Sequence, residues 1–211
     1  MVETIQAQKI NLLDLKLKFG LERNDDGDFF QEWQENLPEL TDLEMAAMDE
    51  VKQEYLHLSQ YPLLEPVVKL VVLSPLLKWA GFYRYPFFLT GEKEVIISSE
   101  DEATIITGML DILVFTPEFW VLVIEAKKTA YSLEVGIPQA LAYMLASPNL
   151  EKPNYGFVTN GTDFIFLKLI QQEKLVYSES DLFSMRRRHN DLWNVLQILK
   201  GLSRLVVQGR E

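Results

Sequence analysis

Three charged residues near the middle of the chain have the types and spacing that metal-assisted chemistry needs. Asp111 lies within the apolar run 108–115, and Glu125 and Lys127 close the next apolar run, 120–127. A Thr-Pro-Glu-Phe link joins the two runs, which predicts an antiparallel hairpin. Charges among apolar residues are costly to bury unless each is satisfied, and one cation would satisfy both acids.

The register of this hairpin decides whether the three side chains meet. With the turn centred near Glu118, residues whose numbers sum to 236 stand opposite each other, so Asp111 faces Glu125. Alternation along a strand puts Lys127 on the same face as Glu125. A slip of one residue would separate them. We therefore expect two carboxylates and one ammonium on one face of the hairpin.

Two carboxylate ligands with room for water and phosphate oxygens suit Mg²⁺, with Mn²⁺ as its substitute. Such an ion polarises a scissile phosphate and acidifies a bound water, while Lys127 positions that water or stabilises the developing negative charge. Phosphodiester hydrolysis by this set needs no histidine or cysteine nucleophile. For an isolated Glu-x-Lys pair the alternative is a buried ion pair without catalytic function. Asp111 opposite Glu125 favours the catalytic interpretation.

The composition limits the classes of function. The 211 residues include no cysteine, which excludes disulfides, thiolate zinc sites and cysteine nucleophiles. A hydrophobic content of 48% is enough for one main domain with a small appended piece. The N-terminus lacks a basic cluster followed by an apolar run, and no apolar stretch reaches membrane-spanning length. We therefore expect a cytoplasmic protein with no membrane partner.

The net charge of −11 opposes a polyanionic partner at first sight, because lysine and arginine supply most non-specific affinity for nucleic acid. The excess of acid is concentrated in residues 1–60, which hold 14 acidic and 5 basic residues, against 17 and 15 in residues 61–211. We therefore divide the chain into an acidic N-terminal extension and a main domain at residue 61. The run Arg186 to Arg188 could contact phosphates, although a solvated loop explains it equally well.

Two helices are expected before the hairpin. Thr41 lies three residues before Glu44, a capping-box pattern that predicts the start of an amphipathic helix ending near Leu58. The next helix should end at Gly81 and bend at Pro75, because proline cannot donate the backbone hydrogen bond of a helix interior.

The remaining periodicities predict strands, one further helix, more strands and a last helix. Residues 1–40 are expected to be an extended or helical adaptor. The expected strands are 82–90, 94–99, 108–115, 119–128, 155–159, 163–170 and 174–178, and the expected helices are 132–147 and 191–207. This order indicates an α/β (α+β) fold, with a mixed central sheet flanked by helices.

These motifs resemble the PD-(D/E)xK nuclease superfamily, in particular the N-terminal nuclease domain of type I restriction enzyme R subunits. The strings GMLD, VLVIEAKK and GIPQALAYM carry the resemblance, which covers residues 61–211. It assigns the motif acids to Asp111 and Glu125, the motif lysine to Lys127 and the helix glutamine to Gln139. A surface amide is the alternative for Gln139.

The resemblance also implies a third metal-ligating acid. In the family a glutamate on the first helix lies ten residues before the proline of a Pro-Leu-Leu triplet, and Glu65 stands in that relation to Pro75. Glu65 would then join Asp111 and Glu125 around Mg²⁺. Leu110 replaces the proline of the motif, and the chain has no Walker motif, so it resembles a free-standing nuclease domain rather than a translocating subunit.

The resemblance implies a restriction-endonuclease-like αβββαβ core and a Mg²⁺-dependent endonuclease that hydrolyses DNA, with RNA left open. One alternative is a nuclease-fold module that binds or regulates without cutting, docking a protein partner or a second copy through its acidic extension. Another is a hydrolase of a different phosphate ester. The complete residue set favours the nuclease, whereas the overall acidity favours the non-catalytic module.

Other conspicuous residues have simpler interpretations. His57 and His189 are expected on the surface, and Glu118 is expected to be solvated in the hairpin turn. The aromatic run 82–88 is expected to be core and strand rather than a platform on which bases stack.

Overall fold

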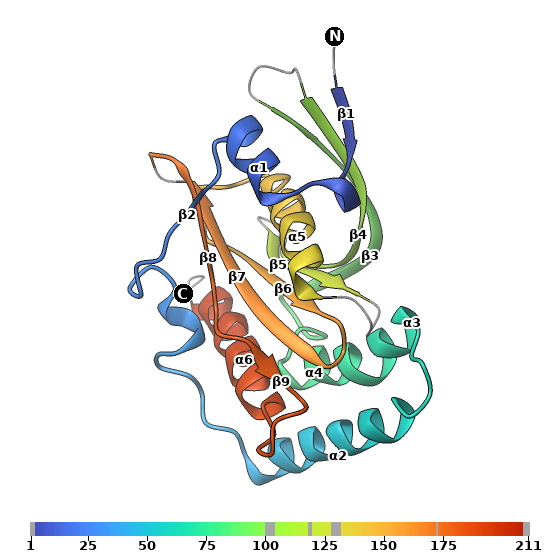
Figure 1. Cartoon of the computed structure of the whole chain (residues 1–211). Helices are drawn as coiled ribbons and strands as arrows, with labels where there is room; N and C mark the ends of the chain where they lie inside the picture. Colours follow the sequence, from blue (N-terminus) through green and yellow to red (C-terminus); the bar gives the residue numbers. More distant parts are fainter. Residues whose placement is uncertain (1–2, 100–103, 118–119, 128–131, 172, 209–211) are drawn as a thin grey trace.

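A central mixed sheet carries helices on both faces in the computed structural model, which describes residues 3–99, 104–117, 120–127, 132–171 and 173–208 (Figure 1). The strands are β1 (Glu3–Gln6), β2 (Glu22–Arg23), β3 (Phe88–Ser98), β4 (Thr104–Phe115), β5 (Trp120–Ala126), β6 (Asn154–Thr159), β7 (Asp163–Gln171), β8 (Leu175–Glu179) and β9 (Phe183–Ser184). The α-helices are α1 (Leu12–Phe19), α2 (Asp42–Leu58), α3 (Glu65–Val68), α4 (Ser74–Trp79), α5 (Gly136–Leu145) and α6 (Leu192–Gln208). Short helical turns are the 3₁₀ segments η1 (Ala7–Lys9), η2 (Gln31–Trp33) and η4 (Leu133–Val135), and the π-helical turn η3 (Lys69–Leu73). Among the helices in these ranges, none has the length and apolar character needed to cross a membrane.

The strand order is β1-β4-β5-β6-β7-β8-β2, with β3 also paired to β4 and β9 paired to β7. β4 is antiparallel to β3 and to β5, whereas β5 and β6 are parallel. A parallel pair needs a crossover connection, and α5 supplies it by packing against β5 and β6. The expected mixed sheet with helices on both faces is therefore confirmed.

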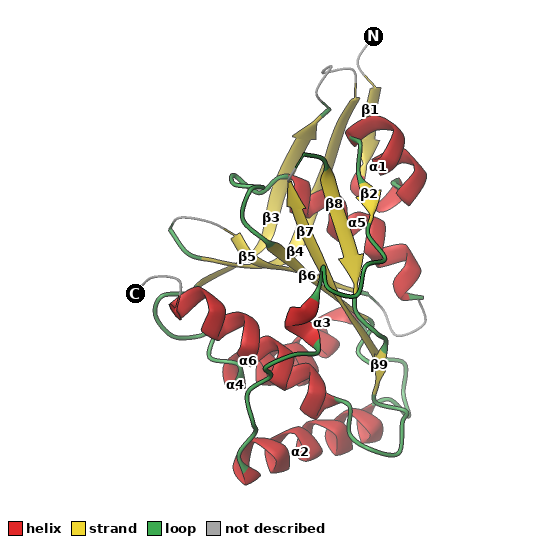
Figure 2. Cartoon of the chain, turned by 90° about the vertical axis from the view of Figure 1, so that its left-hand side faces the viewer, coloured by secondary structure: helices red, strands yellow, loops and turns green. Residues whose placement is uncertain are grey.

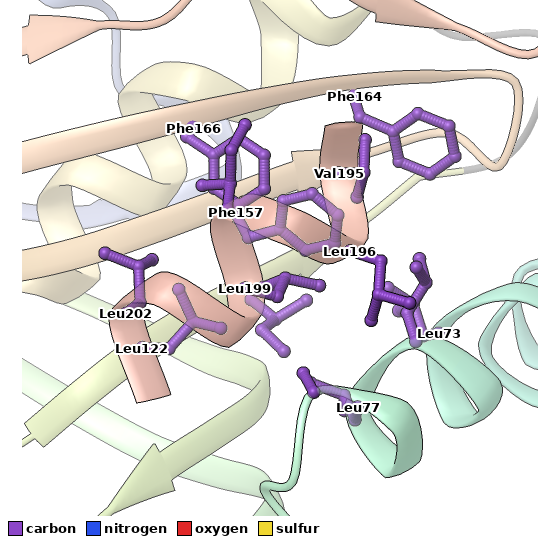
Figure 3. Packing of buried hydrophobic residues seen from close by; sticks show 14 of the residues in the cluster. Leu73, Leu77, Leu122, Phe157, Phe164, Phe166, Val195, Leu196, Leu199 and Leu202 are labelled. Atoms are coloured by element: carbon purple, nitrogen blue, oxygen red, sulfur yellow. The ribbon is translucent and has the colours of Figure 1, made fainter. Parts of the chain in front are cut away.

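Alternation along the strands builds two cores, one on each face of the sheet. On β5, Ile124 contributes to the core under α2, α4 and α6, while Val123 contributes to the core under α1 and α5. Figure 3 shows part of the first core, where Phe157 and Leu122 of the sheet meet Leu199 of α6. Figure 2 shows α6, α4 and α2 grouped on one side of the strands.

The first sixty residues are integrated into this architecture instead of forming a separate acidic layer. β1 lies parallel to β4 and β2 lies parallel to β8. Leu15 of α1 is buried in the α5-side core, and Met48 and Tyr55 of α2 are buried in the other. The predicted capping box is confirmed, since Thr41 accepts from the Glu44 amide and Glu44 accepts from that of Thr41.

One continuous strand, β3, replaces the two strands expected between residues 82 and 99, and the prediction for 82–87 is wrong. These residues form turns after Gly81, and Pro86 lacks the N–H that a strand ladder needs. The aromatic run is divided: Phe82 and Phe87 are buried in the core, whereas Tyr85 is 89% exposed.

We predict that Leu15→Ala lowers the free energy of unfolding by about 2–5 kcal/mol, because it leaves a cavity in the α5-side core. Leu17→Ala is the matched control on the same helix, since Leu17 is 73% exposed, and its effect should stay within about 0.5 kcal/mol. Urea denaturation followed by circular dichroism measures both. An unchanged transition in Leu15→Ala would mean that the N-terminal segment unfolds apart from the rest.

Candidate active site

The candidate site lies where β5 ends, beside its parallel neighbour β6. The Lys127 amide donates to the Thr159 carbonyl at 2.7 Å, which fixes the chain just beyond β5. The predicted hairpin register is confirmed for Ile112 to Val114, whose numbers and those of their partners sum to 236, whereas the pairing shifts by one residue between Val114 and Phe115. Asp111 and Glu125 adjoin the last of these pairs, Ile112 with Ile124. Because Val123 points into the α5-side core, Glu125 also points towards α5.

The Lys127 ammonium joins the strand to the helix. Its Nζ lies 2.5 Å from Glu125 Oε1 and 2.5 Å from Gln139 Oε1. Glu125 and Gln139 are 2% and 3% exposed, so both bonds lie in a dry environment, where they are electrostatically strong. The lysine, the glutamate and the helix glutamine therefore meet in one place, and Gln139 is not the surface amide that the sequence left open.

Tyr143, one turn after Gln139 on α5, fixes the orientation of the glutamine amide. Gln139 Nε2 donates to the Tyr143 hydroxyl at 2.9 Å, and that hydroxyl donates to the Met109 carbonyl of β4 at 3.0 Å. Burial raises the pKa of Tyr143 to about 12, so the hydroxyl keeps its proton. Gly108 permits the contact, because a Cβ there would lie 2.6 Å from the hydroxyl oxygen. The carbonyl of Gln139 is thereby left to face Lys127.

Asp111 binds one group on each of its oxygens. Oδ2 accepts the Ala126 amide at 2.8 Å, which ties Asp111 to the strand position between Glu125 and Lys127. Oδ1 accepts from Lys69 Nζ, also at 2.8 Å. Lys69 is the first residue of η3, in the helical segment formed by α3, η3 and α4, so Asp111 links the hairpin to that segment.

Glu65 is linked to Asp111 by the same lysine, Lys69. Lys69 Nζ lies 2.8 Å from Glu65 Oε1, one helical turn away. Burial lowers the pKa of Lys69, but its hydrogen bonds to Asp111 and Glu65 outweigh that effect and raise the pKa above the ordinary value. Lys69 is therefore a stable cation between two carboxylates.

The backbone is distorted where Asp111 sits. Ile106 and Leu110 of β4 face the α5-side core, and so does Leu113, so the alternation shifts by one residue between Leu110 and Leu113. Across the ladder Glu92 has a positive φ of 50°, an uncommon conformation for a residue with a side chain. Conformations of this kind collect at functional sites.

Glu125 is the most perturbed acid of the site. Burial, and then the negative charge of Asp111, raise its pKa to about 8, against the opposing effect of Lys127. Its Oε2 is buried and has no hydrogen-bond partner among the described residues. An acceptor left in this state carries a desolvation penalty, which a cation or a donor brought by a ligand would remove.

The expected three-acid metal site does not form in this arrangement. In the part of the chain that the structure describes, no three histidine or acidic side chains are grouped so that they could hold a metal ion. The reason is Lys69, whose ammonium lies between Glu65 and Asp111. Glu125 is paired with Lys127, and Asp111 with Lys69.

Sequence reasoning missed Lys69. The available signal was its position four residues after Glu65 on a helix, which indicates an ion pair on one helical face. Its second partner, Asp111, is 42 residues away, and no local pattern points to that contact.

The arginine run lies at the same end of the sheet as the site. The Met185 amide donates to the Thr162 carbonyl at 2.9 Å, in the turn that follows β6. β6 ends at Thr159, which pairs with Ala126 at the site. Arg187 is partly engaged, since its guanidinium lies 3.4 Å from Asp191 and donates to the Leu182 carbonyl.

Helix α2 holds this loop in place. Lys52 Nζ donates to the carbonyls of Arg187 and His189 at 2.8 and 3.0 Å. His189 is exposed, as is His57 on α2, so the expectation for both is confirmed. Glu118, expected in the turn, lies outside the described residues.

We predict that Glu125 makes the metal-free protein less stable as the pH rises. A carboxyl whose pKa is raised from 4.5 to about 8 contributes stability that is complete below pH 4.5 and is lost as the pH passes through 8. Glu125→Gln cannot lose a proton, so its melting temperature relative to wild type should rise between pH 5 and pH 9. Differential scanning calorimetry in EDTA measures this, and a pH-independent difference would contradict the raised pKa.

Comparison with family models and with curated sequences identifies no relative: no protein-family model matches the chain, and no curated protein matches its sequence. The case for a function therefore rests on the arrangement of side chains and on the motif resemblance.

Proposed function

We propose that this chain is a metal-dependent nuclease that hydrolyses phosphodiester bonds of DNA. The observation that carries the proposal is the contact of Lys127 with Glu125 and Gln139, with Asp111 hydrogen-bonded to the backbone between the strand residues. These are the residues that the PD-(D/E)xK resemblance assigns to catalysis. The chain order also supports it, because the helical segment from Glu65, then β3, β4, β5, α5 and β6 follow the αβββαβ order that the resemblance implies.

The side chains fit a divalent cation. Glu125 Oε2 is a buried acceptor without a partner among the described residues, and Asp111, bound to the Ala126 amide, is a second carboxylate close enough to raise the pKa of Glu125. Mg²⁺ is commonly held by one or two carboxylates, with water and substrate phosphates completing the octahedron. Asp111 and Glu125 would hold the ion, and Glu125 would be ionised in that state. The bound ion would polarise the phosphate and lower the pKa of a water molecule.

Lys127 then has a definite role. Its ammonium is held by Gln139, whose amide is in turn oriented by Tyr143, so its position is fixed before any substrate binds. A fixed ammonium beside the phosphate stabilises the negative charge that develops during hydrolysis, because little reorganisation is needed as that charge forms. Gln139 and Tyr143 are positioning residues in this scheme.

The charge around the site implies weak binding of DNA. Arg186 and Arg188 are exposed at the site's end of the sheet, but the adjoining helix α2 carries exposed acids, including Glu50 and Glu54. Lys52 of the same helix contacts carbonyls of the arginine loop, so the acidic helix adjoins the basic loop. Salt largely screens charges only beyond about 8 Å at physiological ionic strength, so neighbouring acids reduce the attraction of the arginines for phosphate. Binding would rest on few phosphate contacts and would weaken as the salt concentration rises.

A non-catalytic module is the second candidate. The pairing of Lys69 with Glu65 and Asp111 favours it, since both acids have a cationic partner without any metal ion. In such a module the contacts of Lys69 with Glu65 and Asp111 would hold the helical segment α3–η3–α4 against the hairpin.

We predict that Mn²⁺ binds the wild-type protein and that Asp111→Asn and Glu125→Gln each weaken its affinity by about tenfold or more, because Mg²⁺-type ions held by a single carboxylate bind weakly. Isothermal titration calorimetry at pH 8 measures the affinity. Glu22→Gln is the control, since it removes an exposed acid paired with Lys174. Binding that is equal in all four proteins would place the metal elsewhere.

We also predict that Lys127→Met reduces DNA cleavage by about a hundredfold or more, as loss of one preorganised charge-stabilising donor typically does, with Mn²⁺ binding retained. Plasmid, single-stranded DNA, RNA and bis(p-nitrophenyl) phosphate are incubated with Mn²⁺ at low salt. Lys174→Met, which removes an exposed lysine, should cut like wild type. Cleavage that persists in Lys127→Met would indicate a contaminating nuclease, and an inactive wild type on every substrate would favour the non-catalytic module.

A further inference from the structure

Lys69 occupies an unusual place in the fold. It is the first residue of the π-helical turn η3, which separates α3 from α4, and π-helical turns are rare and often lie at functional sites. Its Nζ lies 2.8 Å from Glu65 Oε1 and 2.8 Å from Asp111 Oδ1, and its side chain is 24% exposed. One ammonium thus pairs with two carboxylates, one of which is a proposed metal ligand.

A cation at Asp111 and the Lys69 ammonium would repel each other. The ammonium is already within hydrogen-bond distance of Asp111, so an ion bound to the same carboxylate would lie only a few ångströms from it. Screening by solvent is reduced there, because Asp111 and Lys69 have side-chain exposures of 16% and 24%. Lys69 must therefore weaken the binding of the ion or move away from Asp111.

We propose that Lys69 is a built-in counter-cation that competes with the divalent ion for Asp111 and sets the metal affinity of the site. This inference rests on the proposed function, because it takes Asp111 as a metal ligand. In the metal-free protein the Lys69 ammonium satisfies Glu65 and Asp111. When the ion binds, the ammonium gives up Asp111 Oδ1 and keeps Glu65, its neighbour on the same helical face.

Glu65 is then a positioning residue for Lys69 rather than a metal ligand. It lies four residues from Lys69, so the ammonium can remain bound to it after leaving Asp111. A lysine that kept no partner would be poorly held beside the site.

The test is the affinity of the full-length chain for Mn²⁺ without nucleic acid, measured from the electron paramagnetic resonance signal of free Mn²⁺ at low salt. Removing one positive charge a few ångströms from a divalent ion should strengthen its binding by about tenfold or more, so Lys69→Met should bind Mn²⁺ more tightly than wild type. Lys69→Arg keeps the charge and should bind near the wild-type level. Lys69→Gln provides a second uncharged variant should the methionine variant fail to fold.

Two controls separate competition from structural damage. Lys200→Met removes a similarly buried lysine of α6 that pairs with Glu44 of α2 and does not contact the proposed metal ligands. This variant should leave the Mn²⁺ affinity unchanged. Adding Asp111→Asn to Lys69→Met should remove the gain, because the gain depends on Asp111. A merely structural role of Lys69 predicts weaker binding after its removal.

The outcomes are distinct. Tighter binding in Lys69→Met and Lys69→Gln, with Lys69→Arg and Lys200→Met at the wild-type level, supports the proposal. Equal or weaker binding in both uncharged variants overturns it while leaving the metal site in place. Folded wild type and variants that all fail to bind Mn²⁺ would overturn the proposed function itself.

Discussion

The burial of Glu125 is the constraint on which the site depends. Its neighbours on β5 are apolar and buried, and an ionised carboxylate in that environment must gain partners or take up a proton. Lys127 supplies one partner, and its own charge needs a second acceptor, which is Gln139. The side-chain oxygen of Gln139 faces Lys127 because its Nε2 donates to the Tyr143 hydroxyl. The position of α5 against the sheet follows from this chain of contacts as well as from the packing of its apolar face.

The sequence was most informative where a pattern is local. The spacing of the two apolar runs predicts the pairing of Ile112 with Ile124 and of Leu113 with Val123, although the register shifts nearer the link. Alternation along the strand then determines the shared face of Glu125 and Lys127. The start of α2 was equally predictable, because the side chains of Thr41 and Glu44 each accept from the other's backbone amide within one turn.

The sequence was uninformative where the structure depends on contacts between distant segments. Nothing local distinguishes β1 from a loose terminus; it becomes a strand because β4 extends past β5 and offers it an edge. The contact of Lys69 with Asp111 likewise joins two segments that are far apart in the sequence. The shift in alternation near Asp111 is also not visible in the sequence; it coincides with a break in the pairing of β3 with β4, where Glu92 adopts a positive φ.

Two glutamates, Glu44 and Glu125, are buried and paired with a lysine, but the reasons for their burial differ. Glu44 also pairs with a lysine, Lys200, but its oxygens cap α2 through Thr41, so its burial is explained by the helix end. Glu125 caps nothing, and its Oε2 has no partner among the described residues. Buried ion pairs can often be replaced by apolar side chains without loss of stability, so stability alone gives little reason to keep Glu125 in an apolar sheet. A ligand that binds its free oxygen gives such a reason.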